Sequence, residues 1–311
     1  MLSRTAENLF WMARYMERAE STARLIEMGQ RMASLPGAGE RDEWRSVVAS
    51  CGCSERFKDE NRVTEFDAVT ALVLDEDSAA SIRACLAQAR ANGRAVRTAL
   101  TREMWEALND GWRKLETVPT DGPSLRRELP NLLEWTKTRN AVLRGAAETG
   151  MLRNDGWDFM RLGGFIERAD MLLRLLDVKY FVLLPETEVV GGGRDHHQWT
   201  SVLHATSASR AFHHVYRGDY APWKIADFLL LNRAFPRSLI HCYREIGRHL
   251  DRVARRYGRR HECHSTANLM IARLEDAGMG ELFQQGLHEF VEEAIGVNNR
   301  LSNEISRAYH F

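Results

Sequence analysis

The sequence predicts an all-α fold, a duplicated helical bundle with two central Glu-Arg helices. Three observations lead to this prediction. Apolar residues recur at helical spacing over most of the 311 residues, and the period-two alternation typical of a strand is nearly absent. The chain has only 7 prolines, so long helices can run uninterrupted. Two stretches around a Glu-Arg pair resemble each other closely, which is the signature of an internal repeat.

Helices are expected along almost the whole chain, with short linkers marked by proline and glycine at 36–39, 118–123 and 191–193. The three consecutive glycines of the last linker follow no apolar strand and lack the Gly-Lys-Ser/Thr of a phosphate-binding loop, so we expect a flexible connector there. In chain order, the expected helices are 3–33, 42–57, 62–74, 78–117, 122–149, 154–183, 196–216, 221–231, 236–258, 262–276 and 279–309.

The composition narrows the class of protein. Basic and acidic residues number 43 each, which gives a formal net charge of +0. Nucleic acids and anionic membranes attract a basic excess, so neither is an expected partner. No apolar run reaches the ~18–20 residues of a membrane span, and the start of the chain lacks the features of a signal peptide. The five cysteines are irregularly spaced, as expected for a cytoplasmic protein.

Comparison of the sequence with itself predicts a tandem duplication. Residues 7–27 match residues 157–177 at an offset of 150, which superposes the two Glu-Arg pairs. A second match keeps the order at an offset of 157. It pairs Leu72 with Leu229, Asp75 with Asn232, Ser81 with Ser238 and Cys85 with Cys242. The two repeats are therefore expected at 1–150 and 151–311, together forming one compact unit.

Each Glu-Arg helix is predicted to be covered on two sides. In the first copy, apolar residues from Leu9 to Ile26 form one seam, yet the opposite face also mixes Phe10 and Trp11 with charged residues. The second copy repeats this pattern. A helix that is apolar on two sides is usually packed on both, so the motif charges in both copies are expected to be partly buried.

Buried charges need partners, because desolvation costs several kcal/mol per ion. Neighbouring helical residues point about 100° apart, so Glu17 and Arg18 cannot readily pair with each other. Within the helix, Arg14 or Ser21 is near enough to Glu17. A pseudo-twofold arrangement, in which the Glu of each copy meets the Arg of the other, would satisfy all four motif groups. Two roles stay open at this point: the charges fix the register of packing, or they form a ligand or partner site.

These residues make the sequence similar to the alpha-E family, bacterial helical proteins named for a Glu-Arg motif and arranged as a tandem repeat. One position departs from the family pattern. The family usually has arginine after Leu-Gly in the second copy, matching Arg14 in the first, and this chain has Gly164. The segments that carry the resemblance are 2–9, 14–20, 92–97, 103–109, 156–157, 162–163, 166–170, 227–231 and 235–238.

The resemblance implies a cytoplasmic bacterial protein encoded alongside circularly permuted ATP-grasp proteins, transglutaminase-like proteins and a proteasome-like N-terminal-nucleophile peptidase. That setting leads to our first hypothesis, an accessory subunit of an ATP-grasp amide-ligase system for peptide synthesis or modification. The second hypothesis is a stand-alone enzyme that uses Glu and Arg for acid-base and anion-binding chemistry on a peptide or small acidic metabolite. The third is a structural helical adaptor.

The candidate catalytic residues are Glu17 and Glu167, as acid or base in the second hypothesis. Arginine offers a planar fork that grips a carboxylate by two parallel hydrogen bonds, so the arginines are the candidate anion ligands. The candidates for ligand or partner binding are Arg14, Arg18, Arg168, Arg24, Arg174, Glu7, Asn92 and Arg97. No cofactor is expected. No metal is expected either, because His261 and His264 lack zincin spacing and a second ligand pair.

Overall fold

The computed structural model describes residues 3–34, 40–57, 63–182, 193–276 and 286–311, together with residues 278, 280 and 282. Helices dominate these residues and none of them lies in a strand, which confirms the predicted all-α class. The helices are α1 (Ser3–Ala33), α2 (Glu40–Ser50), η1 (Ser54–Arg56), α3 (Glu65–Val73), α4 (Ile82–Ala95), η3 (Arg97–Ala99), α5 (Arg102–Glu116), α6 (Gly122–Gly150), α7 (Asp155–Val182), α8 (Gly193–Ala205), α9 (Ser209–Tyr216), α10 (Pro222–Leu231), α11 (Leu239–Tyr257), α12 (Glu262–Asp276) and α14 (Leu287–Tyr309).

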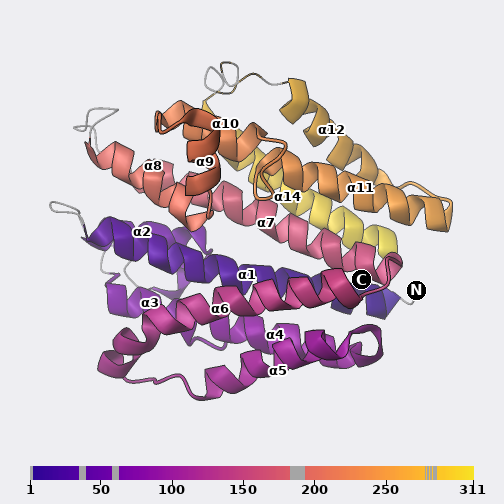
Figure 1. Ribbon diagram of the computed structural model, residues 1–311, viewed down its shortest axis with the longest axis horizontal. Coiled ribbons are helices and arrows are strands. Elements are labelled where there is room, and N and C mark those ends of the chain that lie inside the picture. The colour runs from indigo at the N-terminus through magenta and orange to yellow at the C-terminus, as the bar shows by residue number, and fades with distance from the viewer. Residues whose placement is uncertain are drawn as a thin grey trace.

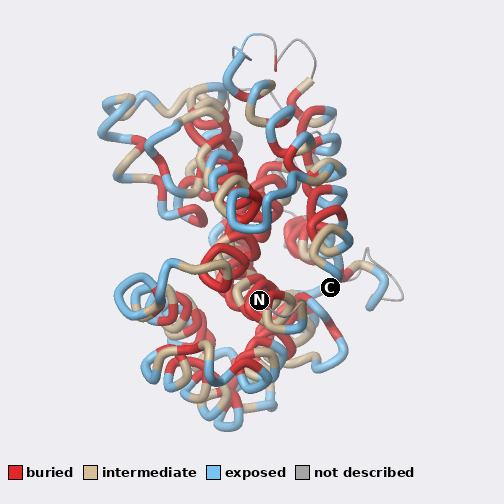
Figure 2. The backbone as a smooth tube through the Cα atoms, turned by 90° about the vertical axis from the view of Figure 1, so that its right-hand side faces the viewer, coloured by how far each residue is buried: buried red, intermediate tan, exposed pale blue. Residues whose placement is uncertain are grey.

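The two Glu-Arg helices, α1 and α7, lie side by side in the middle of the molecule (Figure 1). They form the most extensive helix-helix contact, and α4 and α6 pack against α1 while α11 and α14 pack against α7. Figure 2 shows buried residues concentrated along the centre of the molecule, and most described residues of α1 and α7 are buried. The inference that each is covered on two sides is correct. In α1, Leu9 of the seam and Phe10 of the opposite face are both 0% exposed, and in α7 the matching faces bury Leu162 and Trp157.

Sequence-matched turns in the two halves are built alike. Helices α4 and α11 are capped by Ser81 and Ser238, and each hydroxyl accepts a hydrogen bond from the backbone N–H three residues later. The ends of α2 and α8 also correspond. Gly52 and Ser207 take the left-handed conformation there, with φ of 70° and 55°. These shared turns place the loops before α4 and α11 in corresponding positions beside the central helices.

A glycine permits the close approach of α1 and α7. A Cβ atom added at Gly163 would lie 2.1 Å from the carbonyl oxygen of Phe10, far inside van der Waals contact. The next residue, Gly164, has nothing within 4 Å of such an atom. Gly163 is therefore required by backbone packing and Gly164 is not.

Several expected helix boundaries are wrong. The expected helix 78–117 is three elements, α4, η3 and α5, since Thr101 caps a new helix. The apolar pattern hid this break because Val96 and Leu100 are still buried within it. The expected helix 196–216 is divided between α8 and α9 at Ser207.

The expected helix 42–57 stops at residue 50 and is followed by η1, and 236–258 begins at residue 239. The linkers at 36–39 and 191–192, and parts of the segment 277–286, lie outside the described residues. None of the described helices combines the length and apolar character needed to cross a membrane.

Candidate functional site

The four motif side chains form two reciprocal ion pairs between α1 and α7. Arg18 Nε donates to Glu167 Oε1 at 2.5 Å and its Nη2 donates to Oε2 at 3.0 Å. Arg168 Nε donates to Glu17 Oε1 at 2.7 Å and its Nη2 donates to Oε2 at 3.1 Å. Each pair is bidentate, the geometry that arginine forms best with a carboxylate. The predicted pseudo-twofold pairing is confirmed.

Glu167 binds a second arginine as well. Arg14 Nε donates to Glu167 Oε2 at 2.8 Å, and its Nη1 donates to the hydroxyl of Ser302 on α14 at 2.7 Å. Arg14 thus pairs across to α7 rather than with Glu17 of its own helix. Burial opposes ionisation of Glu167, but the attraction of Arg18 and Arg14 lowers its pKa to about 2.

Glu17 has a different set of additional partners. Arg144 and Asn140 of α6 donate to Glu17 Oε2 at 3.4 and 3.1 Å. Arg237, from the turn before α11, lies 3.7 Å from Oε1. Burial again opposes ionisation, yet Arg168 and Arg144 hold the pKa of Glu17 well below its ordinary value. The Glu17 site therefore draws its cations from three elements, whereas the Glu167 site draws both from α1.

A second layer of ion pairs lies one turn farther along each helix. Arg24 donates to Glu20 on α1, and Arg174 donates to Asp170 on α7, both at i,i+4 spacing. The same arginines cap neighbouring helices, since Arg24 Nη1 donates to the carbonyl of Ala205 and Arg174 Nη1 to that of Ser50. These two predicted residues thus join the cluster as links to α8 and α2.

The motif carboxylates have the features of structural anions. Glu17 and Glu167 are 2% and 0% exposed, both are ionised at neutral pH, and their oxygens accept hydrogen bonds from fixed guanidinium groups. A general acid or base needs a pKa near the working pH and a free path to the substrate. Both motif carboxylates have a pKa far below neutrality, and their pairs already engage most of the Arg18 and Arg168 donors.

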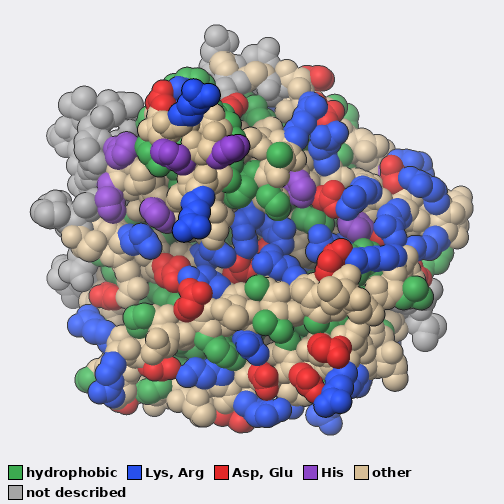
Figure 3. Space-filling model, in the orientation of Figure 1, with side chains coloured by type: hydrophobic (Ala, Val, Ile, Leu, Met, Phe, Trp, Pro, Cys, Tyr) green, Lys and Arg blue, Asp and Glu red, His purple; other side chains and the backbone are tan. Residues whose placement is uncertain are grey.

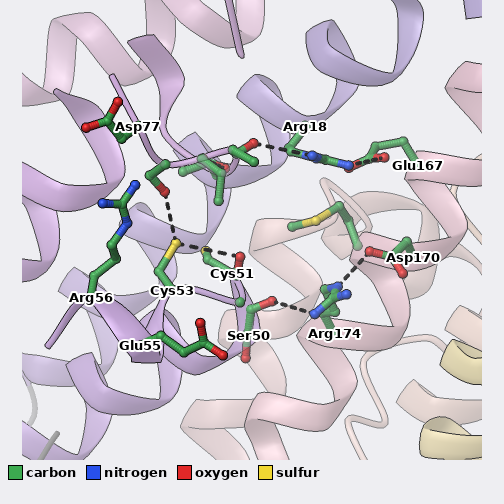
Figure 4. Close-up of a pocket in the computed structure, with 16 residues that line it drawn as sticks. Arg18, Ser50, Cys51, Cys53, Glu55, Arg56, Asp77, Glu167, Asp170 and Arg174 are labelled. Carbon is green, nitrogen blue, oxygen red and sulfur yellow. Dashed lines mark hydrogen bonds and ion pairs between the residues drawn. The ribbon is translucent and has the colours of Figure 1, made fainter. Parts of the chain in front are cut away.

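A polar cavity of about 430 Å³ opens beside this network, next to Arg18 and Glu167. Asp170 and Arg174 line one end, and the turn after α2 and the loop before α4 supply the rest (Figure 4). On the face drawn in Figure 3, Lys and Arg side chains gather near the middle of the molecule, and further charged side chains are spread over the rest of that face. The cavity has the size of a site for a small ligand.

Three predicted site residues lie apart from the cluster. No hydrogen bond or ion pair within the described part of the chain joins Glu7, Asn92 or Arg97 to the motif charges. Arg97 is exposed in η3, with its guanidinium 5.4 Å from the ring centre of Trp105. Asn92 is half-buried on α4 and Glu7 is half-buried on α1.

Several residues of the network were not predicted from the sequence. Glu20 and Asp170 were detectable, because they occupy matched positions three residues after the motif glutamates. Asn140, Arg144 and Arg237 carry no such signal, because they reach α1 from elements more than a hundred residues away. Among the described residues, no group of three or more His, Cys, Asp or Glu side chains is arranged to hold a metal ion.

Comparison with known proteins places this arrangement in context. A family model described as a predicted alpha-helical domain with a conserved ER motif, named Alpha-E, matches residues 1–310. Uncharacterized proteins of Mycobacterium bovis and Mycobacterium tuberculosis (strain CDC 1551 / Oshkosh) are each 25% identical over 271 residues, covering 76% of this chain. The match spans 28% of the length of each of these curated relatives. No solved structure matches the chain.

Proposed function

The chain belongs to the alpha-E family, and we propose that it is an accessory subunit of an ATP-grasp amide-ligase system for peptide synthesis or modification in the bacterial cytoplasm. One observation carries the choice of an accessory role over an enzymatic one. Both motif glutamates are buried, ionised and held in bidentate arginine pairs. Carboxylates in this state join two helices and do not exchange protons with a substrate.

Two further observations support the proposal. The matched region is about a quarter of each mycobacterial relative, so a region of this kind works there as one part of a longer polypeptide. The cavity beside Arg18 also argues against a purely structural adaptor, for which we expect a solid interior. The partners proposed for this chain are a circularly permuted ATP-grasp protein and, in the same system, a transglutaminase-like protein and an N-terminal-nucleophile peptidase.

The test is a pull-down from the native host with the tagged chain, followed by an assay of the captured ATP-grasp protein with and without added chain. We expect co-purification and a rise in ATP-dependent amide formation when the chain is present. Amide formation that is unchanged by the chain would contradict the proposal.

The enzymatic alternative is tested in the same preparation. The Glu17→Gln and Glu167→Gln variants remove the candidate acid or base, and Glu103→Gln, on the exposed face of α5, serves as a variant outside the network. Turnover by the isolated chain that is lost in folded Glu17→Gln or Glu167→Gln, and that Glu103→Gln retains, would favour the stand-alone enzyme.

A further inference from the structure

The two halves differ at one position that faces the cluster. At the offset of 157 that matches Ser81 with Ser238, Arg237 corresponds to Ala80. The neighbouring contact is the same in both halves, because Arg18 Nη1 donates to the carbonyl of Ala79 and Arg168 Nη1 to that of Pro236, each at 3.3 Å. The loops before α4 and α11 therefore hold corresponding places, and a methyl group stands where the other half has a guanidinium.

The guanidinium of Arg237 binds the carboxylate of Glu20. Arg237 Nη2 donates to Glu20 Oε1 at 2.5 Å, and the same oxygen accepts two hydrogen bonds from Arg24. The matched carboxylate is Asp170. Its Oδ2 accepts from Arg174, and its Oδ1 has no partner among the residues described. Asp170 thus lacks a match for Arg237, the second arginine of its counterpart, and because it is only 5% exposed little water compensates its unpaired oxygen.

The cavity lies at this place. Ala80 and Asp170 both line it, together with Arg18 and Arg174 (Figure 4). At this end of the cavity Arg174 pairs with Asp170 and Arg18 pairs with Glu167, yet Oδ1 of Asp170 is a buried carboxylate oxygen without a partner among the residues described. A cationic group that reaches this oxygen would supply the missing partner.

Arg56 lies across the cavity from Asp170 (Figure 4). Its side chain is 39% exposed, and its ion pair with Asp75 is 3.5 Å long, the one ion pair of Arg56 within the described ranges. A carboxylate on the far end of a ligand would reach a guanidinium there that is only loosely engaged.

We propose that this cavity binds a small arginine-like compound, with its guanidinium at Asp170 in the place that Arg237 fills in the other half, and its carboxylate toward Arg56. The ligand guanidinium would pair with Asp170 as Arg237, a residue of the chain itself, pairs with Glu20. The site stands whether or not the chain partners an ATP-grasp protein, because no partner residue enters the argument.

Isothermal titration calorimetry of the full chain tests the ligand chemistry. L-Arginine is the probe, and L-citrulline is the neutral compound of nearly the same shape. We expect L-arginine to bind and L-citrulline to bind at least tenfold more weakly, because a charge-assisted hydrogen bond is lost. Absence of L-arginine binding, equal binding of the two, or binding of L-glutamate in preference to L-arginine would overturn the proposal.

Three variants locate the site. Ala80→Arg copies the second half, so its own guanidinium should fill the place and reduce L-arginine affinity at least tenfold. Ala80→Ser is the matched control and should bind as the unaltered chain does. Asp170→Asn should also lose at least tenfold, which keeps the test decisive where Ala80→Arg does not fold by circular dichroism. Unchanged affinity in folded Ala80→Arg or in Asp170→Asn would contradict the assignment.

Discussion

Glu17 and Glu167 occupy matched positions in the two central helices, yet their surroundings are built from different parts of the chain. Each is held by the motif arginine of the other helix. Around Glu167, the additional cation is Arg14 of α1, and Ser302 of α14 accepts a hydrogen bond from Arg14. Around Glu17, the position matching Arg14 is Gly164, and the additional cations are Arg144 of α6 and Arg237 of the turn before α11.

Helices α6 and α14 pack in corresponding ways, α6 on α1 and α14 on α7. Where position 164 lacks an arginine, Arg144 on the covering helix α6 supplies the charge to Glu17. Where position 14 has an arginine, the covering helix α14 presents the small residue Ser302 instead. The comparison teaches that the two halves share the carboxylate and its motif arginine, but not the residue that supplies the additional charge. The same comparison identifies Ala80, which stands where the other half has Arg237 and which lines the cavity.

The largest effect is expected from breaking the pairs that both halves share. Glu17→Gln leaves Arg168 without its buried anion, and Glu167→Gln does the same to Arg14 and Arg18. Each should lower the free energy of unfolding by about 3–5 kcal/mol, measured by urea denaturation. Glu103→Gln, on the exposed face of α5, is the control and should change it by less than about 0.5 kcal/mol. Motif variants as stable as this control would mean that the pairs add nothing to folding.

The second largest effect is expected from acid, which should lower the free energy of unfolding by protonating Glu167. Its pKa is lowered from 4.5 to about 2, so its ionised form is favoured by folding. The stabilisation is fully present above pH 4.5 and is lost as the pH falls toward 2, by about 3 kcal/mol at most. Urea denaturation at pH 6, 4 and 3 measures the slope. Glu167→Gln should show a shallower decline, and an equal decline would assign the acid sensitivity to other groups.

Alanine substitutions at the adjacent residues Gly163 and Gly164 should change the free energy of unfolding in opposite directions. Gly163→Ala places a methyl group against the backbone of Phe10 and should cost about 1–3 kcal/mol, because α1 and α7 must separate. Gly164→Ala meets open space within a helix and should gain about 0.5–1 kcal/mol. Thermal or urea denaturation of the two variants compares them directly. A tolerated Gly163→Ala would show that the close approach is dispensable.

The smallest effect on the free energy of unfolding is expected from moving the additional arginine at Glu17 from position 144 to position 164. Arg144 is 32% exposed and its contacts to Glu17 and Glu20 are 3.4 and 3.5 Å long, so Arg144→Ser should cost less than about 1 kcal/mol. Adding Gly164→Arg rebuilds the arrangement of the other half and should recover that loss. In the unaltered chain, Gly164→Arg should bring no such gain, because Arg144 already serves Glu17. Equal effects of Gly164→Arg in both backgrounds would contradict the exchange.

Much of this comparison was accessible from the sequence, for identifiable reasons. The helical period and the repeated Glu-Arg segment predicted the class and the two central helices, and the need of buried charges for partners predicted the crossed ion pairs. The arginines at 144 and 237 were out of reach, because which side chains meet α1 depends on packing between distant elements. The breaks near Val96 and Ser207 were missed because buried apolar residues continue across the first and a non-glycine residue takes a left-handed turn at the second.

The central claim is that the Glu-Arg motif joins α1 to α7 by direct crossed pairing. A double-mutant cycle on Glu17→Gln and Arg168→Gln, read by urea denaturation, tests it most directly. The account predicts a coupling free energy of at least about 2 kcal/mol, because each side chain in this buried pair is the main partner of the other. Losses that simply add, with a coupling within about 0.5 kcal/mol of zero, would contradict it.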